Sequence, residues 1–260
     1  RLTDHYDEVV KDATCRLLTY ALNGNADFMG DDIHYASNHD FVGIEFTIHG
    51  MLDGRVRVGM PGKFNADNAL AALAVCTLAL SGGSGVLDDH TKQAILGSLV
   101  KVRVDGRMEI AHVSKKCSVI VDYAHNAVSM ESLLTTLRDY HPKRLVCVFG
   151  CGGNRARDRR YSMGEIGGKM ADLCIITADN PRFEKNEDII KDIEVGLAKT
   201  DGTYLVIPDR REAIFYAIRN AEEGDMIAII GKGHEDYQEI EGVKHHFLDR
   251  EVVEEAVNNV

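Results

Sequence analysis

From about residue 105 onward, the chain alternates short apolar runs with amphipathic stretches, and this pattern limits the possible folds more than any other feature. The apolar runs have strand length, and apolar residues recur at helical spacing in the stretches between them. The predicted strands span 118–121, 144–149, 172–177, 203–207 and 226–230, and the predicted helices span 128–140, 162–170, 188–198 and 211–222. Strands without polar alternation need helices on both faces of their sheet. The pattern therefore predicts a doubly wound, mainly parallel α/β sheet of Rossmann type, closed by a hairpin over 237–247 and a last helix from Asp249.

The first part of the chain follows a different pattern. Apolar and polar residues alternate over 44–48 and 55–58, which predicts two neighbouring strands joined by a tight turn. Asn65 is expected to cap a helix that runs to about residue 80. Asp88 or Asp89 is expected to cap a second helix that ends near residue 100.

Two strands and two helices are too little for a self-contained α/β nucleotide-binding domain. The chain also begins at Arg1 rather than at Met. We therefore expect residues 1–104 to be the C-terminal portion of a domain that starts upstream, and residues 105–260 to be a separate C-terminal domain.

Composition and charge exclude several classes of function. The chain has 260 residues, 45% of them hydrophobic, so it can bury an ample core. Its formal net charge is −11 and it has no basic block, which argues against nucleic acid or an anionic membrane surface as the main partner. No apolar run reaches the about 18 residues that a transmembrane helix needs. We expect a monomer that acts on small molecules.

The cysteines indicate the compartment. They are scattered and form no C-x-x-C pair: Cys15, Cys76, Cys117, Cys147, Cys151 and Cys174. Most of them lie inside apolar runs, as small buried side chains do. We expect reduced thiols in a cytoplasmic protein, and neither disulfides nor a metal site.

Four of the predicted strands run into loops rich in polar and charged residues. These loops are Asp122 to His125, Gly150 to Arg155, Asp179 to Arg182 and Gly231 to Glu235. Ligands of open parallel sheets bind outside the carboxyl ends of the strands, so the four loops are expected to share one rim. Taken singly, each loop also has a purely structural interpretation, such as a helix cap at Asp122 or a surface pair between Arg182 and Glu184. Independent turns have no reason to place charged tips on the same edge, so we expect a binding site.

The residue types indicate the ligand. Arg160, Asn180 and Arg182 supply donors suited to a carboxylate, and an arginine can bind a carboxylate through two parallel hydrogen bonds. Glu235 supplies the opposite charge, which suits an ammonium group. A site with both features predicts an amino acid as the ligand.

At the other end of the same rim, Arg107, Asp122 and Tyr123 could hold a ribose and a base. The sequence has no phosphate-loop motif, no dinucleotide fingerprint, no H-E-x-x-H pair and no G-x-S-x-G elbow. We therefore expect binding residues, but no catalytic nucleophile and no metal ligands in this chain.

Six stretches of the chain resemble the Mur ligases, and among them most closely the branch that adds diaminopimelate. The stretches are GKFNADNALAALA (62–74), GRME (106–109), VDYAHN (121–126), FGCGGNRARDRRYSMG (149–164), TADNPRFE (177–184) and GKGHEDYQ (231–238). The resemblance covers the chain from about Leu2 to its end and is most specific from Gly62 onward. One departure is Asn126-Ala127, where relatives often have Thr-Pro.

The resemblance implies an ATP-dependent amide ligase of peptidoglycan synthesis. In this branch, ATP phosphorylates the D-glutamate side chain of UDP-N-acetylmuramoyl-L-alanyl-D-glutamate, and an amino group of meso-diaminopimelate attacks the acyl phosphate. ATP and Mg²⁺ are the implied cofactors. The family's UDP-sugar domain, phosphate loop, acidic Mg²⁺ ligand and modified lysine are not in this sequence. We therefore expect that this chain alone does not turn over ATP.

The resemblance also assigns residues. On the nucleotide side it implies Asn65, Asn68, Arg107, Asp122, Tyr123 and His125. For diaminopimelate it implies Arg160, Asn180, Arg182, Gly231 and Glu235. The D-N-P-R form of the third loop is similar to that of enzymes that use meso-diaminopimelate, in which the arginine binds the distal carboxylate. Lysine-adding relatives tend to lack that arginine.

Two alternatives remain open at this point. The chain could belong to a lysine-adding or folylpolyglutamate-type relative of the same ligases. It could also be a stand-alone amino-acid-binding module, in which case a start codon would directly precede Arg1.

Overall fold

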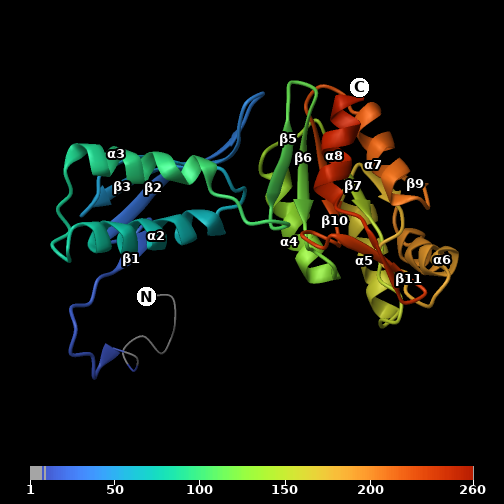
Figure 1. The fold of residues 1–260 in the computed structure, drawn as a ribbon, viewed down its shortest axis with the longest axis horizontal. Coiled ribbons are helices and arrows are strands. Elements are labelled where there is room, and N and C mark those ends of the chain that lie inside the picture. The colour runs from blue at the N-terminus through green and yellow to red at the C-terminus, as the bar shows by residue number, and fades with distance from the viewer. Residues whose placement is uncertain (1–7, 9, 260) are drawn as a thin grey trace. The chain divides into compact units, whose positions relative to one another are not determined.

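The structure is a computed structural model that describes residue 8 and residues 10–259. The chain divides into two compact units, which are described separately (Figure 1). The first unit comprises the described residues up to His34, together with Glu45–Arg57 and Phe64–Leu99. The second comprises Tyr35–Ile44, Val58–Lys63 and the described residues from Val100 onward.

A four-stranded sheet in the order β1-β2-β3-β4 forms the N-terminal part. Its strands are β1 (Tyr20–Leu22), β2 (Phe28–Ser37), β3 (Val42–Gly50) and β4 (Gly54–Val58). In β3, Ile44, Phe46 and Ile48 are fully buried whereas the residues between them are not, so the predicted alternation is confirmed. The strand β2 was not predicted, because consecutive Asp31 and Asp32 interrupt its apolar pattern.

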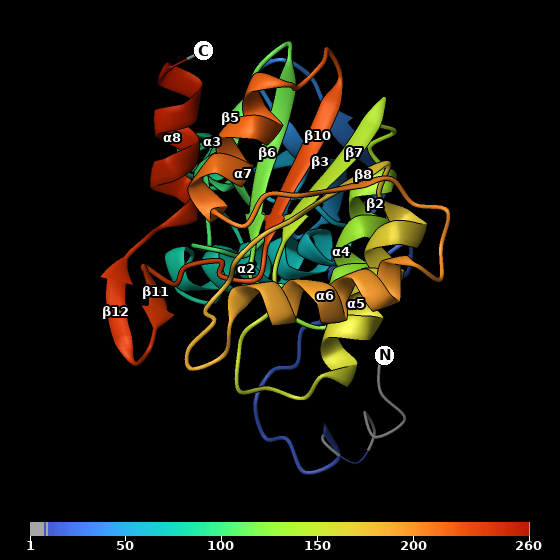
Figure 2. The same cartoon turned by 90° about the vertical axis from the view of Figure 1, so that its right-hand side faces the viewer.

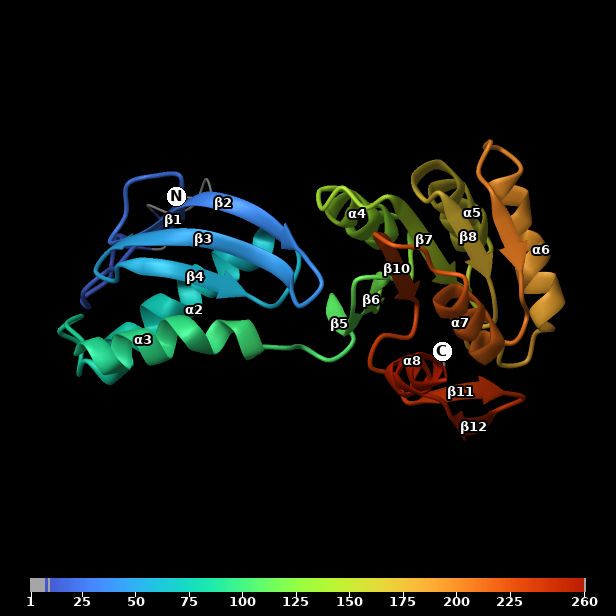
Figure 3. The ribbon, with the colours of Figure 1, turned by 90° about the horizontal axis from the view of Figure 1, so that it is seen from above.

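Helices α2 (Phe64–Leu80) and α3 (Asp89–Ser98) lie along one face of this sheet, and the short 3₁₀ helix η1 (Leu99–Lys101) follows (Figure 3). Asp88 caps α3 as predicted, because its carboxylate accepts a hydrogen bond of 2.9 Å from the Thr91 N–H. The predicted cap at Asn65 is wrong, because α2 already begins at Phe64. Asn65 lies buried in the first turn, where its side-chain oxygen accepts a hydrogen bond from Asn68 at 3.1 Å.

A six-stranded sheet in the order β5-β6-β10-β7-β8-β9 forms the centre of the second unit (Figure 2). Its strands are β5 (Glu109–Val113), β6 (Cys117–Asp122), β7 (Arg144–Phe149), β8 (Leu173–Ile176), β9 (Tyr204–Val206) and β10 (Asp225–Ile230). All neighbours are parallel except β5, which pairs with β6 in the antiparallel direction. The five predicted strands and their mainly parallel arrangement are therefore confirmed. The edge strand β5 was not predicted.

Five helices cover the two faces of this sheet. They are α4 (Ala127–Arg138), α5 (Asp158–Met170), α6 (Asn186–Leu197), α7 (Arg210–Arg219) and α8 (Asp249–Asn258). Successive strand residues face opposite sides: Ile120 packs with α4, α5 and α6, whereas Val119 and Val121 pack with α7 and α8. This two-sided burial explains why the strands are apolar throughout. The hairpin of β11 (Tyr237–Ile240) and β12 (Val243–His246) joins β10 to α8 as predicted.

The cysteines are all free thiols, and four of the six are buried, whereas Cys15 and Cys76 are exposed. None of the helices within the described residues has both the length and the apolar character to cross a membrane.

A buried ion pair joins α7 and α8 to the sheet. Arg210 binds Asp249 through two hydrogen bonds of 2.7 Å, and both side chains are 0% exposed. The same guanidinium donates to the carbonyl of Ala178 at 3.2 Å and to that of Ile230 at 3.0 Å. Since these carbonyls lie at the carboxyl ends of β8 and β10, the ion pair fixes the points from which two of the charged loops begin.

Removal of one partner of this pair should destabilise the fold strongly. We expect Asp249→Asn to lower the free energy of unfolding by about 3–5 kcal/mol, because it leaves a buried guanidinium without its counter-charge. Urea unfolding measures the change. The control Lys191→Ala breaks an exposed pair with Asp188, 3.6 Å apart, and should cost less than about 1 kcal/mol. Equal losses in the two variants would show that the buried pair does not anchor the fold.

Candidate functional site

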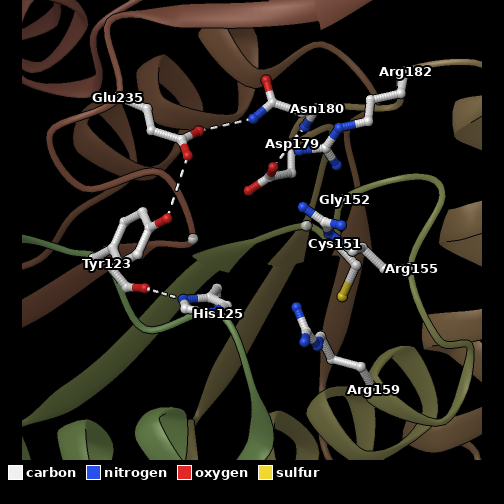
Figure 4. Close-up of a pocket in the computed structure, with 12 residues that line it drawn as sticks. Tyr123, His125, Cys151, Gly152, Arg155, Arg159, Asp179, Asn180, Arg182 and Glu235 are labelled. Atoms are coloured by element: carbon white, nitrogen blue, oxygen red, sulfur yellow. Dashed lines mark hydrogen bonds between the residues drawn. The ribbon is translucent and has the colours of Figure 1, made fainter.

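A hollow lies at the carboxyl ends of β6, β7, β8 and β10, and each of the four charged loops contributes to it (Figure 4). Twelve residues line it: Tyr123, His125, Gly150, Cys151, Gly152, Arg155, Arg159, Asp179, Asn180, Arg182, Gly231 and Glu235. The structure thus brings the four loops together at one rim, as the topology predicts. Cationic guanidinium groups and anionic carboxylates face the same space.

Glu235 forms the acidic part of the hollow and is held by three neighbours. Its carboxylate accepts hydrogen bonds from Asn180 Nδ2 at 2.8 Å and from the Tyr123 hydroxyl at 3.4 Å. The Lys232 ammonium lies 3.6 Å from it and is fully buried. Burial lowers the pKa of Lys232, because it disfavours the charged form.

Asn180 uses both ends of its amide. Its nitrogen donates to Glu235, and its oxygen accepts a hydrogen bond of 2.9 Å from the Glu239 N–H. Its own N–H donates to the carboxylate of Asp179 at 2.6 Å. Because the side chain is only 2% exposed and bonded on both sides, it sets the position of the Glu235 carboxylate.

Arg182 lines the opposite part of the hollow (Figure 4). Its Nη1 donates to the Gly153 carbonyl at 2.9 Å, and its Nε lies 3.3 Å from the Glu239 carboxylate. The alternative surface pair with Glu184 is wrong, because Glu184 binds Arg160 instead. The guanidinium is therefore held at the edge of the hollow.

The glycines of the second loop are needed for more than a turn. A Cβ atom at Gly153 would lie 1.9 Å from the Pro181 carbonyl oxygen, and one at Gly150 would lie 2.2 Å from that of Thr177. The Gly153 N–H donates to the Asn180 carbonyl at 2.8 Å. The absence of side chains allows the second and third loops to pack backbone against backbone.

Arg160 lies outside the lining of the hollow. It is buried, and its guanidinium donates to Glu184 at 2.8 Å and to Asp192 at 2.9 Å. Its Nε has no hydrogen-bond partner among the described residues. In this structure Arg160 connects α5, α6 and the third loop, and a direct contact with an amino acid remains a prediction.

The residues predicted on the nucleotide side belong to both units. Tyr123 and His125 line the same hollow, with their ring centroids 4.8 Å apart. Arg107 is exposed, and its guanidinium carbon lies 4.9 Å from the centroid of the Tyr123 ring. Asn65 and Asn68 lie on α2 in the first unit.

Asp122 does not cap the following helix. Its carboxylate accepts hydrogen bonds of 2.7 Å from the N–H groups of Met108 and Ala124, and the cap of α4 is Asn126. Burial raises the pKa of Asp122, while the two backbone N–H groups act in the opposite direction. Asp122 therefore fixes the turn after β6 that carries Tyr123 toward the hollow.

Two family models match the chain. The Mur ligase, glutamate ligase domain, matches residues 106–233, and the Mur ligase middle domain matches residues 2–76. The chain belongs to the Mur ligase family. One relative is UDP-N-acetylmuramoyl-L-alanyl-D-glutamate–2,6-diaminopimelate ligase 2 of Clostridium acetobutylicum. It is 40% identical to this chain over 252 residues, which are 96% of this chain and 50% of that protein. The diaminopimelate ligase of Aquifex aeolicus is 42% identical over 236 residues, with coverage of 91% and 44%.

Solved structures agree with this assignment. A structure of UDP-N-acetylmuramoyl-L-alanyl-D-glutamate–2,6-diaminopimelate ligase matches with a TM-score of 0.75 at 34% identity, covering 98% of this chain and 51% of that chain. Folylpolyglutamate synthase from Thermotoga maritima matches with a TM-score of 0.59 at 22% identity, covering 85% and 47%, and so shares the fold. This Mur ligase chain spans about half the length of the relatives that it matches.

The structure adds six lining residues that the sequence did not assign to the site: Gly150, Cys151, Gly152, Arg155, Arg159 and Asp179. Arg159 was missed because α5 begins at Asp158, four residues before the predicted start at 162. Its first turn therefore lies at the rim. Asp179 was visible as a polar residue at a strand end, which was a usable signal.

The Cys151 thiol of this Mur ligase should be unreactive although it lines the hollow. Burial raises its pKa to about 12, so its thiolate is roughly a thousandfold scarcer at pH 8 than that of an ordinary cysteine. We expect iodoacetamide at pH 8 to label Cys15 and Cys76, both exposed, and to label Cys151 only after unfolding in urea. Peptide mass spectrometry measures the labelling. Rapid modification of Cys151 in the folded protein would contradict the buried position.

A Cβ atom at Gly153 should separate the second and third loops. We expect Gly153→Ala to lower the free energy of unfolding by about 1–3 kcal/mol, because backbone must move to accommodate the methyl group. Gly97→Ala is the matched control, since a Cβ atom there meets nothing within 4 Å. In helix α3 it should stabilise the protein by about 0.5–1 kcal/mol. Urea unfolding of both variants checks the prediction, which fails if Gly153→Ala is neutral.

Proposed function

We propose that this chain acts as part of an ATP-dependent ligase that joins meso-diaminopimelate to UDP-N-acetylmuramoyl-L-alanyl-D-glutamate in peptidoglycan synthesis. The similarity to diaminopimelate ligases that are 34–42% identical to this chain supports the proposal. In it, the hollow of the second unit binds diaminopimelate.

The distribution of charge in the hollow carries the proposal. Figure 4 shows the Glu235 carboxylate and the Arg182 guanidinium on either side of Asn180. Arg155 and Arg159 add two further guanidinium groups to the lining. This arrangement matches an amino acid that has two carboxylates and two amino groups.

The residues of the chain then have distinct tasks. Glu235 binds an amino group of diaminopimelate, and Arg182 binds the distal carboxylate, which lysine does not have. The reacting amine is a good nucleophile toward an acyl phosphate once it is neutral and correctly placed. The site therefore needs to position the amine and not to supply a nucleophile of its own.

The nucleotide contacts stay proposals. ATP would supply the phosphoryl group that activates the D-glutamate carboxylate. On this chain, the exposed Arg107 beside the Tyr123 ring offers a cation and an aromatic face, which fit a nucleotide. We propose Asn65 and Asn68 as adenine contacts, Arg107 and Asp122 as ribose or adenine contacts, and Tyr123 and His125 as residues on the nucleotide side.

We propose ATP and Mg²⁺ as the cofactors of the ligase. The net charge of −11 supports small-molecule partners over nucleic acid or anionic membranes. We further propose a monomer in the reducing cytoplasm, in agreement with its free thiols.

Loss of the Arg182 guanidinium should remove the preference for diaminopimelate. In calorimetry on the full-length protein, we expect Arg182→Ala to weaken meso-diaminopimelate binding by roughly 2–5 kcal/mol and to leave L-lysine binding unchanged, because only the former has a distal carboxylate. The control Arg211→Ala removes a guanidinium that binds Glu255 outside the hollow. Equal effects on the two ligands, or no effect, would remove Arg182 from the recognition of the second carboxylate.

A further inference from the structure

Strand β11 runs beside the third loop and binds it at several points. The isolated parallel bridge between Arg182 and Ile240 shows that the loop pairs beside this strand, as a short neighbouring strand would. The bonds are Arg182 N–H to Glu239 carbonyl at 3.0 Å, Glu241 N–H to Arg182 carbonyl at 2.7 Å, Glu239 N–H to Asn180 Oδ1 at 2.9 Å and Gln238 Nε2 to Asp179 carbonyl at 3.1 Å. One strand therefore holds the whole loop that faces the hollow.

The backbone of Arg182 needs this support. Its φ is +53°, in the left-handed region that non-glycine residues rarely adopt. Its N–H donates to the carbonyl of Glu239 in β11, and its carbonyl accepts a hydrogen bond from Glu241, directly after the strand. These bonds hold Arg182 in a backbone conformation that would be unfavourable without them.

The side chain of Arg182 is fixed by the same strand. The Glu239 carboxylate lies 3.3 Å from Nε, and the Gly153 carbonyl accepts a bond of 2.9 Å from Nη1. The hydrogen bond to Gly153 and the ion pair with Glu239 involve different nitrogens, and together they restrict the orientation of the guanidinium. The remaining nitrogen, Nη2, has no hydrogen-bond acceptor among the residues that the structure describes, and Arg182 lines the hollow. A ligand carboxylate is thereby directed to the terminal nitrogens.

We propose that Glu239 is a positioning residue that orients the Arg182 guanidinium and thereby sets the preference of the hollow for an amino acid with a second carboxylate. This inference rests on the proposed function. A free arginine side chain loses much rotamer freedom when it binds a ligand, and a neighbour that already orders it removes that cost. Glu239 acts through Arg182 and does not line the hollow.

A carboxylate beside Arg182 has a second, opposite effect. Its negative charge partly neutralises the guanidinium and so weakens the attraction for a ligand carboxylate. The two effects predict different results for two variants. Glu239→Gln removes the charge but keeps a polar oxygen beside Nε, whereas Glu239→Ala removes both.

Calorimetry with meso-diaminopimelate and L-lysine on the full-length protein separates the two effects. We expect Glu239→Ala to weaken diaminopimelate binding about tenfold, with lysine changed less than about twofold, and Glu239→Gln to keep most of the preference. Glu131→Ala, an exposed residue of α4 with the same charge change, serves as the control. Equal weakening for both ligands, or tighter diaminopimelate binding in both Glu239 variants, would overturn the proposal.

A double-variant comparison tests whether the effect passes through Arg182. In an Arg182→Ala background, Glu239→Ala should not weaken diaminopimelate binding further, because there is no guanidinium left to orient. A further loss would show that Glu239 acts by another route and would overturn the assignment.

A spectroscopic measurement tests the contact without a ligand. The Arg182 Nε–H signal in nitrogen–proton correlation spectra is identified by its loss in Arg182→Ala. It should shift and exchange faster with water in Glu239→Ala, and stay unchanged in Glu131→Ala. An unchanged signal in Glu239→Ala overturns the positioning role. If instead the signal changes but the wild-type protein does not prefer diaminopimelate, the proposed function fails while the contact stands.

Discussion

The buried pair of Arg210 and Asp249 determines where the recognition loops begin. Burial of a guanidinium is tolerable only when its donors are satisfied, and here the carboxylate and the carbonyls of Ala178 and Ile230 do so. Those carbonyls close the ends of β8 and β10, directly before two of the loops that form the hollow. Helices α7 and α8 therefore help to fix the geometry of the hollow, although they do not line it.

Two of the charged groups that line the hollow, Glu235 and Arg182, are each held by other residues. Asn180 holds the Glu235 carboxylate, and the Gly153 carbonyl and Glu239 hold the Arg182 guanidinium. Because these contacts exist without a ligand, little ordering of Glu235 and Arg182 is left for the moment of binding. Such a site is suited to a reaction whose main requirement is the placement of an amine beside an activated carboxylate.

The sequence predicted the features that depend on patterns along the chain. Unbroken apolar strands gave the two-sided sheet, and strand direction gave the shared rim of the loops. It did not predict the features that depend on partners distant in sequence: the pairing of Glu184 with Arg160, or the placement of Tyr123 beside Glu235. The cap expected at Asn65 failed because capping residues also occur within first turns, where tertiary packing decides.

The support for Arg182 comes from an element outside the six-stranded sheet. The hairpin β11–β12 forms its own two-stranded sheet, and none of its strand residues is buried. Because the hairpin contributes little to the core, substitutions there can change recognition at a small cost in stability. Under the proposed function, an arginine in the third loop is then not sufficient for selecting a second carboxylate. In that proposal its guanidinium also needs the carboxylate of Glu239 on β11, so the specificity of the hollow would depend on a pair of residues from two separate segments.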